Sequence, residues 1–476
     1  MTRLVIVCTI AMLWTGASCV RSQEGETKSQ PNIILIVADD MGWGDVGYHG
    51  SEIQTPNIDR LSREGVVLDR YYVAPVCSPT RAGLMTGRYP DRYGLRETVI
   101  PPWSEFGVDT SEVFLPELLA RAGYAHRGLV GKWHLGHGVP DFHPLNRGFT
   151  HYYGHLNGNI DYFTHKREGE LDWHRNDRPS YDKGYSTDLI TEEAVRFIRD
   201  CAEDDAPFFL YVAYNAPHTP LQAKKEDLLL YGFDENKPLF NGRSNGYGSK
   251  GRGNTVRQTY SAMVTAMDRG IGHVLEALEE LGIDSNTVVV FQSDNGGHPK
   301  GGGNNDPLRG TKGSEWEGGV RVPAIIRWTG ALPSGLVVDQ VTGYVDMLPT
   351  LCDLAGVDDR GGKPLDGRSM LPVLKGTGKW DDRLFYLGNG AIVSRQWKLL
   401  RAGPKGRPTD LLFAIDNDPG ETMDVKDQHP AILEKLNSAL DDFARIRSDR
   451  TAPPYEEGRT GFKAPREWQI LNKASD

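Results

Sequence analysis

The sequence predicts an α/β fold in which helices flank a mostly parallel central sheet, with a smaller C-terminal α+β subdomain. Two observations support this prediction. The chain has 476 residues, which is enough for one large α/β domain and a smaller one. Four hydrophobic runs, of which the one at residues 124–130 is weaker, alternate with helical stretches, and continuous β-branched runs among them are typical of parallel strands covered on both faces.

Polar or reactive side chains follow each of the four predicted strands. The strands are expected at residues 32–38, 124–130, 207–213 and 287–291. The side chains that follow them are, in order, Asp39 and Asp40, Lys132 and His134, His218, and Asp294 and Asn295. Because ligands bind beyond the carboxyl ends of parallel strands, the four groups together indicate one site.

The clearest helix is expected over residues 260–282, where apolar side chains recur at spacings of three and four and Gly282 can end the helix. The preceding residues 230–255 are rich in Gly, Asn, Lys and Arg and read as a long surface loop. This loop either lines a substrate cleft or is a tolerated insertion.

The pattern changes after residue 369. Short strand-like runs at 391–393 and 397–400 are followed by helical periodicity at 431–446. We therefore expect a catalytic domain over residues 31–374 and an α+β subdomain over residues 375–476.

The N-terminus predicts export. Arg3 precedes an apolar run and then small residues up to Cys19, which indicates a signal peptide over residues 1–19 rather than a membrane span. Residues 20–30 are expected to be a flexible leader. The mature protein is thus predicted to be secreted or periplasmic, without a transmembrane span, and either cleaved after a small residue or anchored as a lipoprotein through Cys19.

Charge and cysteine content exclude other classes. The formal net charge of −10 makes non-specific binding of nucleic acid unfavourable. Apart from the N-terminal cysteines and Cys77, only Cys201 and Cys352 remain, and these either form a disulfide or are two buried thiols.

Cys77 begins the segment Cys77-Ser78-Pro79-Thr80-Arg81. Pro79 suits the first turn of a helix, which would leave Cys77 at the positive end of that helix and Arg81 about one turn further on. Such a position favours an anionic nucleophile and an anionic substrate. The alternative is a buried structural cysteine that precedes Ser-Pro.

Asp39, Asp40, Asp294 and Asn295 offer only oxygen ligands. Such a set suits a hard cation, Ca²⁺ or Mg²⁺, rather than zinc. Each pair alone also occurs in ordinary turns, but their position at strand ends favours a metal site. Further candidates for chemistry are Lys132 and His134, which face the same side of an extended segment, and His218 and Lys312.

The sequence resembles the formylglycine-dependent sulfatases of the arylsulfatase type, which belong to the alkaline phosphatase-like superfamily. The resemblance runs from about residue 31 to residue 366. It rests on six motifs in the family's order, at residues 38–42, 77–81, 131–136, 216–218, 293–297 and 308–312.

The resemblance implies that a formylglycine-generating or sulfatase-maturating enzyme oxidises Cys77 to formylglycine, whose hydrated aldehyde attacks sulfur. A divalent cation, Ca²⁺ or alternatively Mg²⁺, would be held by Asp39, Asp40, Asp294, Asn295 and the modified Cys77. Arg81, Lys132 and Lys312 would bind the sulfate oxygens. His218, helped by Lys312, would protonate the leaving oxygen, and His134 would take the proton that lets sulfate leave.

The substrate is expected to be a sulfated carbohydrate. Residues 152–163 and 171–174 are dense in aromatic and amide side chains, which either bind sugar rings or form a packed aromatic loop. The substrate-binding candidates are Tyr153, Asn157, Asn159, Asp161, His174 and Asn304. This stretch and residues 302–305 most resemble the N-acetylgalactosamine-4-sulfatase (arylsulfatase B) branch, which implies a sulfated polysaccharide or its oligosaccharides, with a 4-sulfated galacto-configured sugar.

Two rival functions have the same expected fold. A phosphomonoester or phosphodiester hydrolase normally uses Ser or Thr as nucleophile and often two zinc ions with several His ligands. A catalytically inactive sulfated-glycan-binding protein predicts gaps among the catalytic residues, and the sequence has none at the motif positions.

Overall fold

The computed structural model describes residues 30–470 apart from residues 97, 243–246, 359, 361, 379, 389 and 403–408. The predicted signal peptide and Cys19 lie outside the described residues, as does all of the predicted leader except Gln30. Among the residues that are described, no helix is both long and apolar enough to cross a membrane.

A large mixed sheet forms the centre of the fold. Its described strands lie in the order β13 (Leu336–Val338), β2 (Val66–Leu68), β12 (Ala324–Trp328), β11 (Thr287–Ser293), β1 (Asn32–Ala38), β10 (Phe208–Ala213), β4 (His126–Lys132), β5 (His151–His155), β8 (His174–Arg175) and β9 (Arg178–Pro179). The central strands β11, β1, β10, β4 and β5 are parallel, while β12 and β8 run antiparallel to their neighbours. The predicted mostly parallel central sheet is confirmed.

Strand β4 lies two residues later than the sequence predicts. Tyr124 is still part of the turn after α3 (Leu115–Arg121), since its N–H donates to Leu119. At the other end, Gly131 and Lys132 pair with Gly154 and His155 of β5. Lys132 is therefore the last residue of a strand rather than part of a loop, which fixes its backbone firmly.

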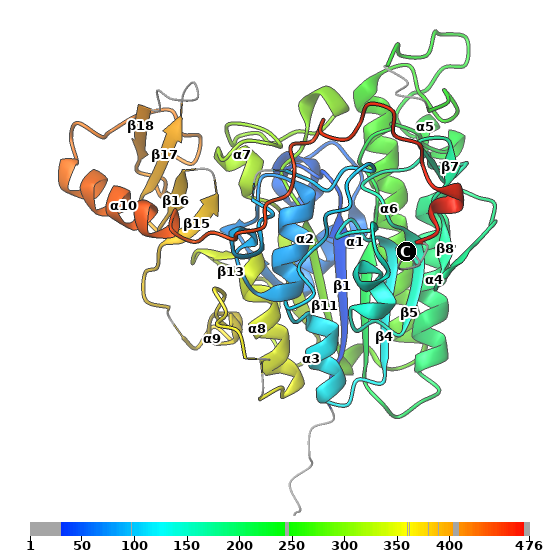
Figure 1. Ribbon diagram of the computed structural model, residues 1–476, viewed down its shortest axis with the longest axis horizontal. Coiled ribbons are helices and arrows are strands. Elements are labelled where there is room, and N and C mark those ends of the chain that lie inside the picture. Colours follow the sequence, from blue (N-terminus) through cyan, green and yellow to red (C-terminus); the bar gives the residue numbers. More distant parts are fainter. Residues whose placement is uncertain are drawn as a thin grey trace, which may run out of the picture.

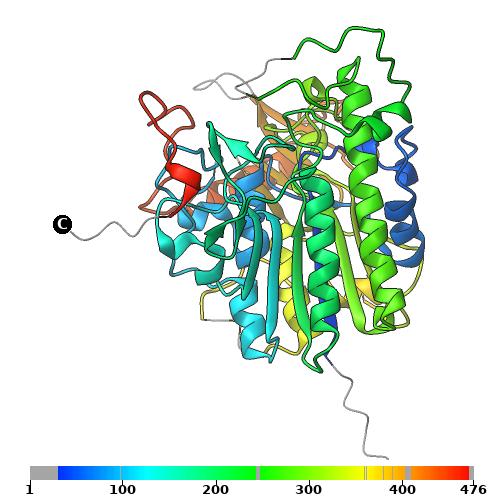
Figure 2. The same ribbon diagram turned by 90° about the vertical axis from the view of Figure 1, so that its right-hand side faces the viewer.

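Helices cover both faces of the sheet because alternate side chains of the central strands point to opposite sides. Ile34 and Ile36 of β1 pack with α1 (Pro56–Glu64), α4 (Ser186–Cys201) and α6 (Val256–Glu280). Helices α4 and α6 lie side by side on this face (Figure 2). The predicted helix at 260–282 is α6, which begins four residues earlier because Thr255 caps it by accepting from the N–H of Gln258.

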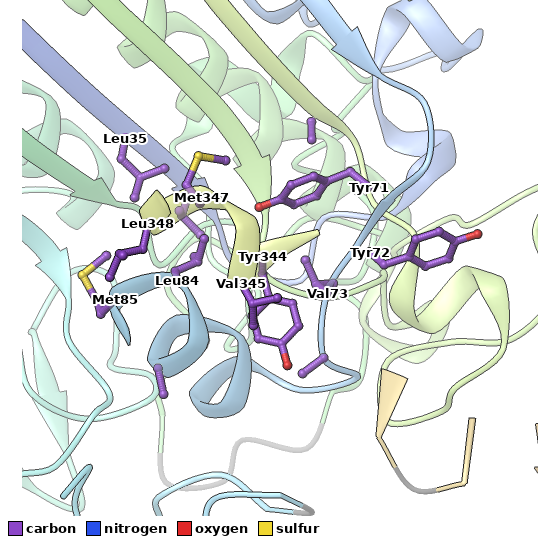
Figure 3. Packing of buried hydrophobic residues seen from close by; sticks show 14 of the residues in the cluster. Leu35, Tyr71, Tyr72, Val73, Leu84, Met85, Tyr344, Val345, Met347 and Leu348 are labelled. Atoms are coloured by element: carbon purple, nitrogen blue, oxygen red, sulfur yellow. The ribbon is translucent and has the colours of Figure 1, made fainter. Parts of the chain in front are cut away.

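The opposite face is covered by α2 (Cys77–Thr86), α3 and α8 (Tyr344–Ala355). Figure 3 shows Leu84 and Met85 of α2 beside Met347 and Leu348 of α8, close to Leu35 of β1. This packing holds the helix that begins with Cys77 directly against the central strand.

The remaining α-helices and strands of the described residues are short. They are β3 (Tyr71–Tyr72), β14 (Thr342–Gly343), β6 (Lys166–Arg167), β7 (Glu170–Leu171), α5 (Lys225–Leu229), α7 (Glu317–Val320) and α9 (Leu371–Leu374). Cys201 and Cys352 are both free and buried, and they belong to the apolar clusters on opposite faces of the sheet.

A smaller antiparallel sheet follows in the chain, which confirms the predicted α+β character of this region. It contains β15 (Phe385–Gly388), β16 (Ala391–Val393), β17 (Lys398–Ala402) and β18 (Thr409–Phe413), and α10 (Pro430–Phe443) packs beside it. After α10 the chain returns across the large sheet domain as residues 447–470 (Figure 1). The domain division at residue 374 stays a prediction.

Candidate active site

The charged side chains that follow the central strands meet at one edge of the sheet. Asp39 and Asp40 come directly after β1, Asp294 and Asn295 directly after β11, and Lys132 ends β4. The strand order β11-β1-β10-β4 brings these carboxyl ends together. All of these side chains are buried.

Helix α2 points its N-terminus into this group. Cys77 is its first residue, and Pro79 lies in the first turn, as the sequence predicts. One turn later, the fully buried Arg81 places Nη2 2.8 Å and Nε 2.9 Å from Oδ2 of Asp294. The helix thus presents the Cys77 side chain and a fixed guanidinium to the same carboxylates.

Two lysines complete the charge balance. Lys132 Nζ lies 2.7 Å from Oδ2 of Asp39, and Lys312 Nζ lies 2.5 Å from Oδ1 of Asp40. The same Lys312 ammonium is 3.5 Å from Sγ of Cys77. Burial raises the pKa of the Cys77 thiol to about 11, against the opposing effect of Lys132 and Lys312, so the unmodified thiol is neutral at pH 7.

The acidic group has the features of a hard-cation site. Ligand atoms of Asp39, Asp40, Cys77 and His218 all lie within 4.8 Å of one another. Oδ1 of Asp39 and Oδ1 of Asn295 are buried and have no hydrogen-bond partner among the described residues. Uncompensated buried oxygens are costly, and a divalent cation would satisfy both. The residues present therefore fit such an ion.

Burial also acts on the acid–base state of this group. It raises the pKa of Asp39 to about 7, although Lys132 acts in the opposite direction. Lys312 and His218 together outweigh the same effect at Asp40 and hold its pKa below the usual range. A cation bound at Asp39 would favour the ionised carboxylate there.

The two predicted catalytic histidines have different hydrogen bonds. His134 Nε2 lies 3.1 Å from the carbonyl oxygen of Ile100, which can only accept, so Nε2 carries the proton. His134 Nδ1 is buried and has no partner among the described residues. Burial, Lys132 and Arg81 hold the pKa of His134 well below its ordinary value, so the ring offers a free lone pair.

In His218 the other ring nitrogen, Nδ1, contacts a backbone carbonyl. Its Nδ1 lies 2.6 Å from the carbonyl oxygen of Thr219, and its Nε2 is 3.6 Å from Oδ2 of Asp40. Burial and the nearby Lys312 lower the pKa of His218 to about 3, against the effect of Asp40. A bound anion next to this ring would raise that pKa and favour a protonated Nε2.

Two site residues have left-handed backbone conformations. Asp40 has φ of 70° and His134 has φ of 59°, values that residues with side chains adopt rarely. Hydrogen bonds hold both: Asp40 N–H donates to Oδ1 of Asp294, and His134 N–H donates to the carbonyl of Leu156. Strain of this kind concentrates at functional sites.

A cleft of about 630 Å³ opens above this group. Cys77, His134, His218 and Lys312 line its base, and Asn159 lies on one wall. The base therefore combines a modifiable side chain, two imidazoles and a cation. This is the arrangement expected for attack on an anionic ester whose leaving group extends into the cleft.

The predicted substrate-binding residues are in different places. Only Asn159 lines the cleft, where its Oδ1 accepts hydrogen bonds from Arg167 and Tyr247. The others have structural partners instead. Tyr153 donates to Asp182, Asn157 and His174 contact the buried Asp172, Asp161 accepts from Gln222, and the N–H of Asn304 donates to Asp45.

Several cleft residues were not predicted. These are Trp103, Arg167, Glu168, Tyr247, Tyr455 and Arg459. Tyr247 belongs to the loop at 230–255, for which the sequence left open a place in the cleft. Tyr455 and Arg459 lie more than three hundred residues from Cys77, and no sequence pattern connects them to it.

Comparisons with known proteins agree with this geometry. The sulfatase family profile matches residues 31–357. Arylsulfatase J of Mus musculus is 32% identical over 490 residues, covering 90% of this chain and 78% of that protein. N-acetylgalactosamine-6-sulfatase of Rattus norvegicus is 36% identical over 453 residues, covering 83% of this chain and 81% of that protein.

A solved structure gives the same result at the level of the fold. The crystal structure of Ps i-CgsB in complex with k-i-k-neocarrahexaose has a TM-score of 0.79 and 36% identity, and the match covers 90% of this chain and 96% of that one. These relatives differ in their named substrates, so they do not single out the N-acetylgalactosamine-4-sulfatase branch. From its fold, its site and these relatives, the chain belongs to the sulfatase family and is a sulfuric ester hydrolase.

Proposed function

We propose that the protein hydrolyses sulfate esters of a carbohydrate, using formylglycine derived from Cys77 and a divalent cation, Ca²⁺ or alternatively Mg²⁺. One observation carries this proposal. Cys77 lies at the base of the cleft, at the N-terminus of α2, with Lys312 Nζ 3.5 Å away and acidic ligand atoms within 4.8 Å. A neutral buried thiol has no evident role there unless it is converted to formylglycine.

The absent groups would supply a nucleophile and charge stabilisation. Formylglycine would provide a hydrated aldehyde as the nucleophile, and Asp39, Asp40, Asp294 and Asn295 would hold a cation that stabilises negative charge. Arg81, Lys132 and Lys312 bind the sulfate oxygens. Arg81 and Lys132 are fully buried and Lys312 is partly buried, and carboxylates already position all three, so they need little reorganisation when charge develops on the sulfate.

The two imidazoles divide the proton transfers. His218, with its Nε2 facing the acidic group, donates a proton to the leaving sugar oxygen, and Lys312 assists it. The pKa of His218 is low in the free protein, so its protonation depends on the negative charge of the bound sulfate ester. His134 accepts a proton at its unpartnered Nδ1 when sulfate is released.

For the substrate, we propose a sulfated polysaccharide or its oligosaccharides, with a 4-sulfated galacto-configured sugar. One relative, N-acetylgalactosamine-6-sulfatase, supports a galacto-type sugar by its printed name, and the solved complex with k-i-k-neocarrahexaose supports an oligosaccharide ligand. The 4-position rests on the resemblance of residues 152–163 and 302–305 to the N-acetylgalactosamine-4-sulfatase branch. Export as a secreted or periplasmic protein, or a Cys19-anchored lipoprotein, completes the proposal.

The test is release of free sulfate from a panel of defined sulfated saccharides. The protein is co-expressed with a formylglycine-generating or sulfatase-maturating enzyme and assayed with Ca²⁺ or Mg²⁺. We expect turnover of at least one 4-sulfated galacto-configured saccharide, and none by Cys77→Ala. Matched phosphate esters serve as the control, and faster release of phosphate than of sulfate would contradict the proposal.

A further inference from the structure

The segment of residues 447–470 forms one wall of the active-site cleft. It leaves α10 and crosses the large domain in front of the sheet (Figure 1). Several hydrogen bonds hold it there, among them Ala452 N–H to Gly94 O at 2.8 Å, Trp103 Nε1 to Tyr455 O at 2.7 Å, and Trp468 Nε1 to Arg167 O at 3.0 Å. The segment is therefore positioned by the catalytic domain rather than by the small sheet.

Two arginines line the cleft, and one of them, Arg459, lies at its outer end, because its side chain is 58% exposed whereas Cys77 at the base is 2% exposed. Arg167 comes from β6 and Arg459 from the returning segment. Among the described residues that line the cleft, Glu168 is the single acidic one, and its Oε1 lies 3.5 Å from Nη2 of Arg167. With Lys312 at the base, the lining carries three lysine or arginine cations against one carboxylate, so the cleft favours more than one anionic group.

Arg167 is built into the wall. It is only 8% exposed, and its Nη1 donates to the hydroxyl of Tyr247 at 2.6 Å and to Oδ1 of Asn159. Its Nε is buried and has no hydrogen-bond partner among the described residues. These contacts fix a guanidinium, a phenol and an amide together beside the cleft, which is more than a solvated surface needs.

Of the two arginines, Arg459 can exchange its partner for a ligand more easily. Its side chain is 58% exposed, and its described ion pair is with Glu456 on the same turn, at 2.8 Å. Such exposed pairs contribute little stability, so a ligand anion can replace Glu456 easily. The Arg459 guanidinium also lies over the ring of Trp103, at 5.1 Å from its centroid, and Trp103 offers an aromatic surface for a sugar ring.

We propose that this outer end is a second subsite, which binds an anionic group on the sugar that adjoins the sulfated sugar being cleaved. Arg459 and Arg167 bind the anion, and Trp103 and Tyr455 contact the sugar ring. The proposal rests on the proposed function, since it assigns the leaving saccharide to the outer part of the same cleft. The anion is a sulfate or a uronic acid carboxylate, which share the chemistry that a guanidinium recognises.

The test measures binding, so that it does not depend on turnover. Cys77→Ala protein with Ca²⁺ is titrated with three disaccharides that carry the same sulfate ester on one sugar. The adjoining sugar is neutral, sulfated, or a uronic acid. We expect one or both anionic probes to bind about fivefold to tenfold more tightly than the neutral probe, and to lose that advantage in high salt.

Two further variants locate the effect. Arg459→Gln in the same background should reduce the preference to about twofold or less, and Arg459→Lys should keep part of it. Arg445→Gln is the matched control, because Arg445 also forms an exposed pair three residues away, with Asp442, but does not line the cleft. It should keep the full preference.

The outcomes separate this inference from the proposed function. Equal binding of all three probes, tighter binding of the neutral probe, or an unchanged preference in Arg459→Gln would each overturn the subsite. A clear preference in binding, combined with no sulfate release by the mature protein, would leave the subsite standing and refute the hydrolase proposal.

Discussion

The protein contains two buried clusters of charge that look alike in composition but differ in access. The first joins Asp39, Asp40 and Asp294 to Arg81, Lys132 and Lys312 at the base of the cleft. The second joins Lys398 of β17 to Glu317 and Glu421, with Nζ–O distances of 2.9 and 2.8 Å. All three residues of the second cluster are fully buried, and none lines the cleft.

This difference in access shows how a functional site can be distinguished from a structural network of ion pairs. The first cluster opens onto a cleft, at whose base Lys312 lies beside Cys77. Among the described residues, a buried oxygen without a hydrogen bond and a positive φ occur in both clusters, at Asp39 and Asp40 in the first and at Glu421 in the second, so the cleft is the feature that separates them. The second connects separate parts of the chain: Glu317 N–H donates to Glu421 at 2.7 Å, and Tyr72 donates to Glu317 at 3.0 Å. Because this cluster is buried and does not line the cleft, a ligand cannot reach it, and it holds these parts of the chain in place.

The second cluster also helps to position the first, because it contacts the backbone loop that carries Lys312. Lys312 lies in the loop between Arg309 and Glu317, and both ends of that loop contact Glu421. The segment between β18 and α10, which contains Glu421, therefore anchors a loop that carries a catalytic candidate. The comparison predicts that changes in the first cluster remove activity while the fold persists, and that changes in the second remove stability.

The largest effect is expected for Asp294→Asn. This change keeps the shape of the side chain but removes a charge that faces Arg81 and the cation site. We expect sulfatase activity to fall about 10³-fold or more, with loss of bound metal. Metal content by elemental analysis and circular dichroism of the folded protein check the two halves of the claim. An Asp294→Asn protein that keeps its metal and its rate would contradict the site.

His218→Ala should act selectively within the first cluster. A sugar oxygen is a poor leaving group and needs a proton, whereas an activated phenol leaves without much help. We expect the loss with a sugar sulfate to exceed the loss with an activated aryl sulfate by about 10²- to 10⁴-fold.

His134→Ala is the comparison variant for this prediction. Release of sulfate from the enzyme is common to both substrates, so both should slow similarly. Steady-state rates of the two variants on the two substrates decide the matter, and equal losses for His218→Ala would assign the acid to another residue.

Lys398→Ala should act on stability. It leaves Glu317 and Glu421 buried without their ammonium partner, and breaking a buried pair in this way costs about 3 to 5 kcal/mol. The free energy of unfolding, measured by denaturant titration, should fall by that amount. Lys426→Ala, which removes a partly exposed pair with Asp424 in the same region, is the control and should leave the free energy of unfolding almost unchanged.

The sequence predicts the first cluster well because its signals are local. Each strand is an apolar run, each run is followed by its polar residues, and a parallel sheet brings such ends together without further information. Pro79 likewise indicates the start of α2. The fold class and the enzyme class are confirmed, whereas the residue roles and the substrate stay predictions.

The outer cleft and the second cluster depend on long-range contacts that no local pattern encodes. Arg459 reaches the cleft because the chain returns after α10, and Lys398 is buried in a strand that reads as half-exposed. At the aromatic stretch of residues 152–163 the sequence leaves a sugar-binding surface and a packed loop as alternatives. Composition alone cannot distinguish a sugar-binding surface from a packed one. In the structure Tyr153 is buried, and its ring centroid lies 5.2 Å from that of Trp173.

The central claim is that Cys77 is the precursor of the nucleophile, and the mass of the peptide that contains it tests this most directly. Protein co-expressed with a maturating enzyme is digested, and the Cys77 peptide is analysed alongside sulfate release from the same sample. We predict that specific activity rises in proportion to the fraction of peptide with the mass of formylglycine. Full activity in a sample whose peptide contains only unmodified cysteine would contradict the account.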